Sequence, residues 1–332
     1  MLSVFNLYLK SFKENIKKDK KYISDSSGIV YLNWQPNTWF ENFIMHRIPS
    51  KQDRYRLLFC GVDGRRTSLK SYDIPKIFYS GENCQPYIEH KMCNADKKSD
   101  VYWWFDRKQK LYSDQRVNDV DLSLGFPYIE AENYLRFPLW ICYIINPYST
   151  YSDVENVVKQ INTKVFLENA YGGVCINTHD SYGLRTYICN EVSEVLDIAY
   201  PGKWRHNTDD LWKYYGNDKL RYLENFKFNI CAENMDACGY CTEKLFDAFR
   251  CGCIPIYAGC QNNPEPEIIN KSSIIMWNLD SDNIQNINFI KELNENEKLC
   301  KEFFGQKKLL DGTVDYIWDI LYKLEMNIKN LL

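Results

Sequence analysis

The chain has 332 residues and a mass of 39.5 kDa, enough for one large domain or two ordinary ones. Hydrophobic residues make up 45% of it and its net charge is −3, which excludes a disordered chain and a basic nucleic-acid-binding protein. Its 25 Tyr, 17 Phe and 9 Trp can stack on sugar faces, although most of them are expected in the core.

The N-terminal residues 1–21 do not read as a signal peptide, because the apolar residues precede the lysines and no small-residue cleavage site follows. The apolar run 137–145 is shorter than the roughly 20 residues of a membrane-spanning helix. Thirteen cysteines without a signal peptide indicate free thiols in a reducing compartment. We therefore expect a soluble protein in the cytoplasm of a bacterium, or of a host cell if the protein is viral.

The first half alternates short apolar runs with turn-rich segments, which predicts strands and an α/β domain ending near residue 150. The expected strands cover residues 29–32, 56–60, 75–79 and 120–126. Residues 90–116 are polar and rich in Lys and Asp, and they read as an irregular surface insert.

The second half begins with a polar, helix-like stretch at 151–170 and then predicts a second α/β set. Its expected strands are 174–176, 226–232, 253–257 and 272–277, and its expected helices are 184–198, 242–250 and 314–332. Ligands bind at the strand-to-helix turns of open α/β sheets, and a helix N-terminus suits a phosphate.

Three charged groups lie at such turns. Lys244 is in the first turn of a helix that Thr242 can cap, where a cation opposes the helix dipole unless an anion compensates it. Arg185 follows a polar loop containing His179, and its planar fork of donors suits phosphate. Glu82 follows the strand at 75–79, where a carboxylate can reach a proton as a general base.

Each of these groups also has a structural interpretation. Lys244 and Arg185 could be solvated residues on ordinary helices, Glu82 a turn acid in water, and His179 a polar loop residue. A metal is not expected, because the Cys238-x-x-Cys241 pair has no second pair of ligands to complete a tetrahedral site.

Longer segments resemble the family-10 fucosyltransferases, the group that contains the α1,3/4-fucosyltransferases. Residues 226–234 (FKFNICAEN) resemble the Tyr-Lys-Phe…Glu-Asn-Ser segment of the family, and residues 239–249 (GYCTEKLFDAF) its Tyr-Val-Thr-Glu-Lys core. Residues 253–259 (CIPIYAG) resemble its Val-Pro-Ile-Tyr-Gly continuation. In the first half, Gly81-Glu82-Asn83 and residues 134–138 (YLRFP) are similar to the Gly-Glu-Asn and Arg-Tyr-Leu-Arg-x-Pro motifs.

The resemblance implies a GT-B fold, with two Rossmann-like domains facing a cleft. Residues 1–150 would form an acceptor-binding domain that carries the catalytic base, residues 151–312 a GDP-fucose-binding domain, and residues 313–332 a C-terminal helix. It also implies inverting transfer of L-fucose from GDP-fucose to a galactose or N-acetylglucosamine hydroxyl of a glycan, in α1,3 linkage by family default, without a metal or other cofactor.

The resemblance further assigns roles to individual residues. Glu82 would be the base, and Arg185 and Lys244 would hold the pyrophosphate, a role that suits cations facing a leaving GDP. Further contacts to the donor are implied for Asn234, Tyr240 and Glu243, and possible contacts in the donor loop for Asn177, His179 and Tyr182.

Some features leave alternatives open. Met235 stands where the family usually has Ser, and Asn177-Thr178 replaces Ser-Asn ahead of Arg185. The first half matches the family less closely, so α1,2 or α1,4 linkage stays open. Another nucleotide sugar on the same fold, or a non-enzymatic glycan-binding protein, are the alternatives to fucose transfer.

Overall fold

The computed structural model describes residues 19–50, 54–165 and 169–332. The chain divides into two compact units. Unit 1 holds the residues up to Pro86, Trp103–Tyr151 and Ile317–Leu332, and unit 2 holds Tyr87–Tyr102 and Ser152–Tyr316. The expectation about a signal peptide concerns residues 1–21, most of which lie outside the described ranges.

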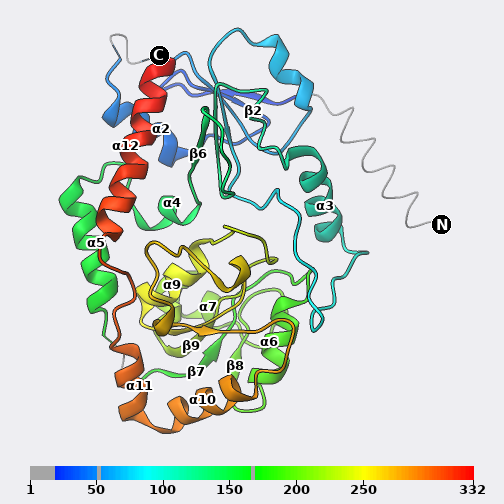
Figure 1. Ribbon diagram of the computed structural model, residues 1–332, viewed down its shortest axis with the longest axis vertical. Coiled ribbons are helices and arrows are strands. Elements are labelled where there is room, and N and C mark those ends of the chain that lie inside the picture. The colour runs from blue at the N-terminus through cyan, green and yellow to red at the C-terminus, as the bar shows by residue number, and fades with distance from the viewer. Residues whose placement is uncertain (1–18, 51–53, 166–168) are drawn as a thin grey trace. The chain divides into compact units, whose positions relative to one another are not determined.

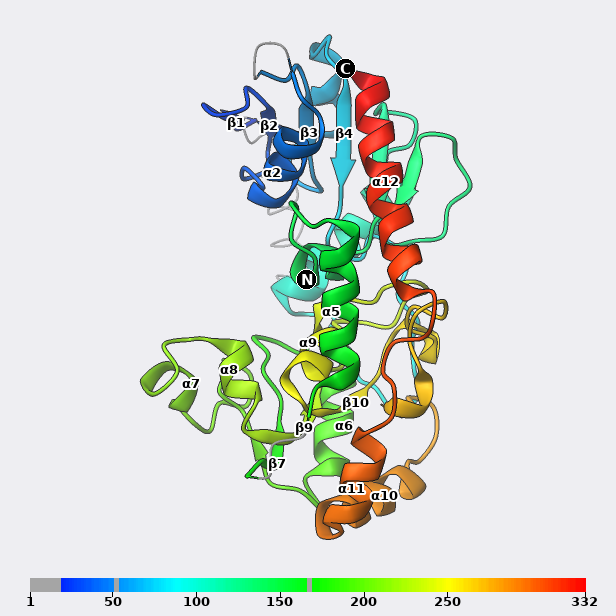
Figure 2. The ribbon, with the colours of Figure 1, turned by 90° about the vertical axis from the view of Figure 1, so that its left-hand side faces the viewer.

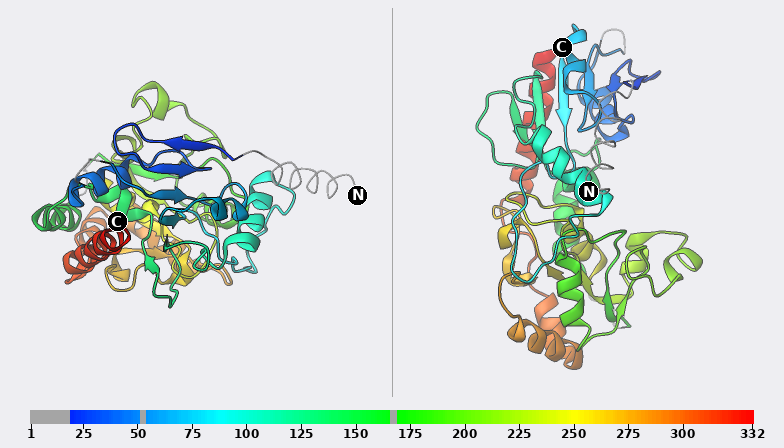
Figure 3. Two further views of the ribbon diagram at one scale, coloured as in Figure 1. Left: turned by 90° about the horizontal axis from the view of Figure 1, so that it is seen from above. Right: turned by 90° about the vertical axis from the view of Figure 1, so that its right-hand side faces the viewer.

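Unit 1 is built on a six-stranded sheet in which each strand pairs with the next along the chain. The strands are β1 (Lys21–Ile23), β2 (Val30–Leu32), β3 (Leu58–Cys60), β4 (Lys76–Tyr79), β5 (Leu122–Gly125) and β6 (Tyr134–Arg136). Only β1 and β2 pair antiparallel; β2 to β6 are parallel. Figure 2 labels β1 to β4 in this order, and Figures 1 and 3 show the same strands in colours that run from blue to green.

The four strands predicted for the first half are present, each shorter by one or more residues at its ends, and β1 and β6 were not predicted. Besides the C-terminal helix, the helices of unit 1 are α2 (Thr38–Arg47), η1 (Arg66–Ser71), α3 (Asp100–Tyr112, from Trp103 onward) and α4 (Trp140–Ile144). The prediction of an irregular insert at 90–116 is wrong where α3 forms. The polar composition of this stretch gave no indication of the helix, which buries Phe105, Lys108 and Tyr112 on one side.

Apolar side chains on the two faces of this sheet fix the strand that leads to Glu82. On one face Phe78 of β4 packs in a buried cluster with residues such as Leu58 and Tyr112. On the other face, the Tyr79 ring lies 4.9 Å from Phe40 of α2 and 5.9 Å from Trp34. Buried rings of this size hold β4 in register, so the turn that follows it has a fixed starting point.

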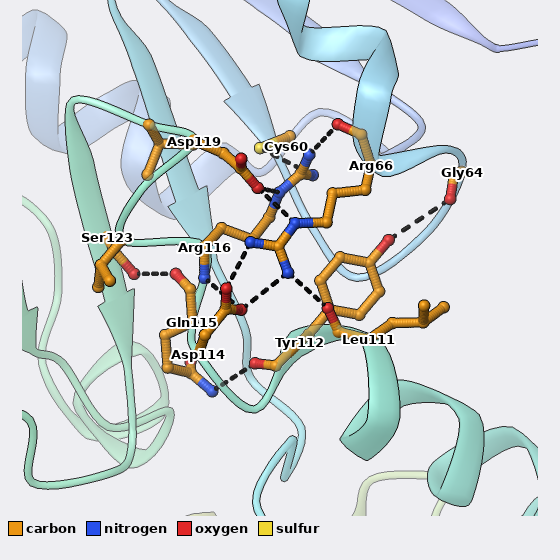
Figure 4. Close-up of polar contacts among 12 residues, drawn as sticks. Cys60, Gly64, Arg66, Leu111, Tyr112, Asp114, Gln115, Arg116, Asp119 and Ser123 are labelled. Carbon is orange, nitrogen blue, oxygen red and sulfur yellow. Dashed lines mark hydrogen bonds and ion pairs between the residues drawn. The ribbon is translucent and has the colours of Figure 1, made fainter.

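A charged network fixes the connection between α3 and β5 (Figure 4). Arg66 contacts both Asp114 and Asp119, with its Nε 2.5 Å from Asp119 Oδ2. The buried Arg116 donates to the backbone carbonyl of Arg66 at 2.6 Å and lies 3.5 Å from Asp119. Each arginine therefore faces a carboxylate, which is what burial of a charge requires.

Unit 2 contains a five-stranded parallel sheet in the order β11-β10-β9-β7-β8. The strands are β7 (Tyr171–Val174), β8 (Ile198–Ala199), β9 (Phe226–Ile230), β10 (Ile254–Tyr257) and β11 (Ile275–Met276). β8 follows β7 in the chain and pairs with one side of it, whereas the next strand, β9, pairs with the other side of β7. The strand order therefore reverses between β7 and β9. Open α/β sheets bind ligands beyond the carboxyl ends of the strands at such a switch point.

The helices of unit 2 are α5 (Tyr151–Thr163), α6 (Leu184–Val192), α7 (Asp210–Lys213), α8 (Lys219–Leu223), α9 (Glu243–Cys251), α10 (Ile284–Glu295) and α11 (Glu297–Phe304), with short 3₁₀ turns η2 (Cys260–Asn262) and η3 (Lys271–Ser273). The segment with α7 and α8 extends from the rest of the unit as an arm (Figure 2). The strand expected at 174–176 starts three residues earlier, at Tyr171, and ends at Val174. The helix expected at 184–198 ends at Val192.

The C-terminal helix α12 (Thr313–Leu331) forms where the apolar period predicted it, with Ile317, Ile320, Leu321 and Leu324 buried. From Ile317 onward it belongs to unit 1, where the guanidinium of Arg47 on α2 lies 5.1 Å from the centre of the Trp318 ring. Across the described ranges no helix is long and apolar enough to cross a membrane. Both units carry mostly parallel sheets with helices, so the α/β class is confirmed.

Candidate functional site

Arg185 crosses the switch point of unit 2. It lies in the first turn of α6, and its side chain is almost fully buried, with 1% of the residue exposed. Its Nη1 donates to the backbone carbonyl of His179 at 2.6 Å, and its Nη2 donates to Asn234 Oδ1 at 2.7 Å. Nη2 also lies 3.3 Å from the carbonyl of Ala232. Arg185 thus joins the loop after β7 to the loop after β9.

Asn234 and Tyr240 lie next to this arginine. Asn234 accepts from Arg185, and its Nδ2 lies 3.4 Å from the hydroxyl of Tyr240. Only 1% of Tyr240 is exposed, so the structure places it behind Asn234 rather than at the surface. The predicted donor residues Arg185, Asn234 and Tyr240 therefore form one hydrogen-bonded chain.

Glu233 is a residue of this region to which sequence reasoning gave no role. It is fully buried at the end of β9, and its Oε1 accepts from the backbone N–H of Thr242 at 2.8 Å. Its Oε2 accepts from the hydroxyl of Thr242 at 2.7 Å and lies 3.2 Å from Lys244 Nζ. An acid only three residues after the largely buried strand β9 was the signal that could have identified it.

This arrangement revises the capping of α9. Thr242 is the N-cap residue as expected, but its hydroxyl donates to Glu233 instead of accepting from the helix. The carboxylate of Glu233 supplies the negative charge that favours a helix N-terminus. The positive charge of Lys244 in the first turn is thus already compensated by Glu233. The position of Lys244 alone is therefore no evidence for a bound diphosphate.

Lys244 keeps access to the surface in spite of these contacts. Its Nζ lies 2.9 Å from the hydroxyl of Thr242, and 17% of its side chain is exposed. Glu243 lies beside it, 3.8 Å from Nζ. Burial raises the pKa of Glu243, but the charges of Lys244 and Lys219 outweigh burial and lower it below its usual range. The start of α9 therefore presents a fixed cation next to an ionised acid.

The loop after β7 carries the three further candidates. Asn177 donates to the thiol of Cys175 at 3.0 Å, which turns it back towards the strand end. Tyr182 is 2% exposed, and its ring lies 4.5 Å from Tyr87 and 5.2 Å from Tyr102. The structure therefore places Tyr182 beneath a segment from the first half of the chain.

His179 is the third candidate in this loop, and it is neutral at physiological pH. Burial and the positive charge of Arg185 lower its pKa to about 4, although Asp180 opposes that shift. Its buried Nδ1 has no hydrogen-bond partner among the residues that the structure describes. A neutral imidazole can accept a hydrogen bond at one nitrogen and donate one from the other.

A lowered histidine pKa makes folding stability depend on pH. The unfolded chain binds a proton below the ordinary pKa of 6.5, whereas the folded chain does so only near 4. The neutral His179 therefore contributes fully to the free energy of unfolding above pH 6.5, and this contribution is lost as the pH falls towards 4. When the pH is lowered from 7 to 5, the free energy of unfolding of the wild type should fall because of His179. In His179→Gln this fall should be smaller by about 1–2 kcal/mol, as measured by urea titrations at the two pH values. Equal losses would contradict this, and His206→Gln serves as the control.

Glu82 lies in unit 1, in the turn that follows β4. The hydroxyl of Ser80 donates to the backbone carbonyl of Glu82 at 2.7 Å, and the N–H of Glu82 lies 3.3 Å from the same hydroxyl. The next residue, Asn83, is buried and accepts from the N–H of Gln85 at 2.9 Å. Two side chains therefore shape this turn, and the side chain of Glu82 is partly exposed.

Metal-ligand geometry gives no further candidate. Among the residues that the structure describes, no group of three or more His, Cys, Asp or Glu side chains could hold a metal ion. Cys238 is exposed and Cys241 is buried, so the two thiols of this pair do not face one surface.

Residues 170–323 match the family described as "Glycosyltransferase family 10 (fucosyltransferase) C-term". The chain is similar to alpha-(1,3)-fucosyltransferase FucT of Helicobacter pylori, with 21% identity over 80% of this chain and 55% of that protein. It is 32% identical to alpha-(1,3)-fucosyltransferase B of Drosophila melanogaster over 30% of this chain and 22% of the other. The match thus spans about half the length of the Helicobacter relative and a smaller share of the Drosophila relative.

The fold is shared with solved structures. A crystal structure of an alpha1,3-fucosyltransferase matches with a TM-score of 0.59 and 18% identity, covering 92% of this chain and 93% of the other. A structure of alpha1,3-fucosyltransferase with GDP-fucose matches with a TM-score of 0.57 and 17% identity over 98% of both chains. The predicted GT-B fold class is confirmed by this likeness.

Proposed function

We propose that this chain, whose residues 170–323 match the C-terminal model of glycosyltransferase family 10, is a member of that family and transfers L-fucose from GDP-fucose to a glycan hydroxyl. The observation that carries the proposal is the link from Arg185 to Asn234 across the switch point of unit 2, where Rossmann-like sheets bind nucleotides. Lys244 adds a second cation at the start of α9, where the loop that follows β9 ends.

The reaction that fits these groups is a single displacement. Glu82 takes the proton from the acceptor hydroxyl, the acceptor oxygen forms a bond to the anomeric carbon, and the bond from that carbon to the phosphate oxygen breaks. The electron pair leaves with GDP, and attack from the opposite face inverts the anomeric centre. Cations placed where charge develops on the leaving group stabilise the transition state, and Arg185 and Lys244 have that role here.

Each further donor residue has a place in this scheme. Asn234 and Tyr240 support Arg185, while the ionised Glu243 can accept from a hydroxyl of the donor. The acceptor is a galactose or N-acetylglucosamine unit, and the linkage is α1,3. Because side chains supply the positive charge, the reaction proceeds without a metal, and turnover in EDTA tests that point.

The proposal predicts nucleotide binding with a preference for the guanine base. In thermal-shift measurements we expect GDP to raise the melting temperature, and UDP and CDP to have little effect. At 100 times its Kd, a ligand that binds only the folded state adds about 2.7 kcal/mol of stability. A larger shift with UDP would assign the fold to another nucleotide sugar.

Transfer itself is tested with GDP-fucose and N-acetyllactosamine or lactose. We expect GDP release that depends on the acceptor, and a fucosylated product whose linkage is read from its fragmentation or NMR spectrum. GDP release at the same rate without an acceptor would sink the transferase proposal. An α1,2 or α1,4 product would keep the proposal and change the linkage.

A further inference from the structure

Residues 87–97 come from the first half of the chain but are part of unit 2. Backbone N–H groups of this segment donate to three separate loops of that unit. Ile88 bonds the carbonyl of Asp236 at 2.9 Å, Met92 that of Leu279 at 3.2 Å, and Asp96 that of Ser181 at 2.8 Å. The segment therefore connects the loops that follow β7, β9 and β11.

His90 anchors the segment with its side chain. The ring is 8% exposed, with Nε2 2.9 Å from Asp236 Oδ2 and Nδ1 3.0 Å from Asp280 Oδ2. The remaining carboxylate oxygens are also used, because Asp236 Oδ1 accepts from the N–H of Gln261 and Asp280 Oδ1 from that of Lys91. Both ring nitrogens of His90 thus lie within hydrogen-bond distance of a carboxylate oxygen, and hydrogen bonds to a charged group are stronger than neutral ones.

The same segment packs against the start of α6. Gly183 is the N-cap of this helix at a φ of +79°, and a Cβ there would lie 2.7 Å from the backbone N and O of Asn94. The neighbouring Tyr182 ring lies 4.5 Å from Tyr87. Arg185 follows Gly183 by two residues, so the backbone of residues 94–96 fixes the point from which Arg185 projects.

We propose that residues 87–97, held by His90, form part of the donor site, and that His90 is a positioning residue for GDP-fucose binding. This inference rests on the proposed function. Each anchor lies close in sequence to a donor group: Asp236 follows Asn234 by two residues, and Gly183 precedes Arg185 by two. Without the His90 contacts, the two loops spend less time in the arrangement that binds the nucleotide.

The expected kinetic signature is a change in donor affinity rather than in chemistry. When only a fraction of the molecules is competent to bind, the apparent Kd rises by the inverse of that fraction, while turnover of the bound complex is retained. For His90→Ala we expect the Kd for GDP and the KM for GDP-fucose to rise about tenfold, within the range of typical site couplings. We expect kcat to stay within about twofold of the wild type.

The test combines these constants with hydrogen–deuterium exchange of the apo protein. We expect faster exchange in residues 177–185 of His90→Ala, with exchange in β9 and in unit 1 unchanged. His206→Ala is the matched control, because His206 also contacts a carboxylate of unit 2, with Nε2 3.0 Å from Asp209. Asp280→Asn is a milder second variant, since the Asp280 side chain is 54% exposed, and it should shift the same quantities in the same direction.

Unchanged GDP affinity in both variants would overturn the inference, as would faster exchange across the whole of unit 2, which indicates a role in folding alone. Failure of the proposed function looks different. In that case the wild type releases no GDP from GDP-fucose in the presence of an acceptor, although the exchange of residues 177–185 still responds to His90→Ala.

Discussion

Glu82→Gln is expected to lower kcat for fucose transfer by about 10²–10⁴-fold, the usual contribution of a general base. Glutamine has nearly the same shape as glutamate but cannot take the proton of the acceptor hydroxyl. The turn should persist, because the Ser80 hydroxyl bonds the backbone carbonyl and N–H of residue 82, which the substitution leaves in place. Steady-state kinetics with GDP-fucose and N-acetyllactosamine measure the loss.

Binding of GDP separates this effect from misfolding. The proposed donor groups Arg185 and Lys244 belong to unit 2, whereas Glu82 belongs to unit 1, so the Kd for GDP should change by less than about twofold. Glu130→Gln is the matched control, an exposed acid in the loop after β5 of the same unit, and it should keep normal turnover. Normal turnover in Glu82→Gln would mean that another group is the base.

The secondary structure near the site could be predicted because local signals agree there. The apolar run that became β9 is bounded by an acid and an amide, and the helix that became α9 has apolar residues at a 3.6-residue period. For these two elements the predicted and observed ends differ by at most two residues. Unlike the equally short β2 and β3, β1 and β6 are not buried and so lack an apolar run in the sequence; they form because neighbouring strands supply their partners.

The contacts of the site could not be predicted, because they join residues far apart in the chain. Nothing in the sequence pairs Glu233 with the N-terminus of α9, or His90 with Asp236 and Asp280. Residues 90–97 were part of the stretch 90–116 that was predicted to be a surface insert, because its side chains suit water. The role of residues 87–97 depends on backbone bonds to three loops, and such bonds leave no trace in side-chain composition.

Lys244→Met is expected to lower kcat/KM for GDP-fucose by about 10²–10³-fold and also to destabilise unit 2. Activity falls because the leaving phosphate loses a cation. Stability falls because the fully buried Glu233 loses the amine 3.2 Å from its Oε2. Breaking a buried pair costs about 3–5 kcal/mol, and the bonds from Thr242 and Tyr257 to Glu233 place this case at the lower end. Kinetics and urea unfolding measure the two losses.

A second substitution separates these two consequences. In Lys244→Met combined with Glu233→Gln no uncompensated charge is buried, so most of the lost stability should return. Activity should stay low, because the cation is still absent. Lys164→Met is the control, since it removes a lysine paired with Glu224 at 2.7 Å in the same unit and should change both quantities little. If the double variant recovers activity together with stability, Lys244 acts only by neutralising Glu233, and the phosphate contact must be assigned to Arg185 alone.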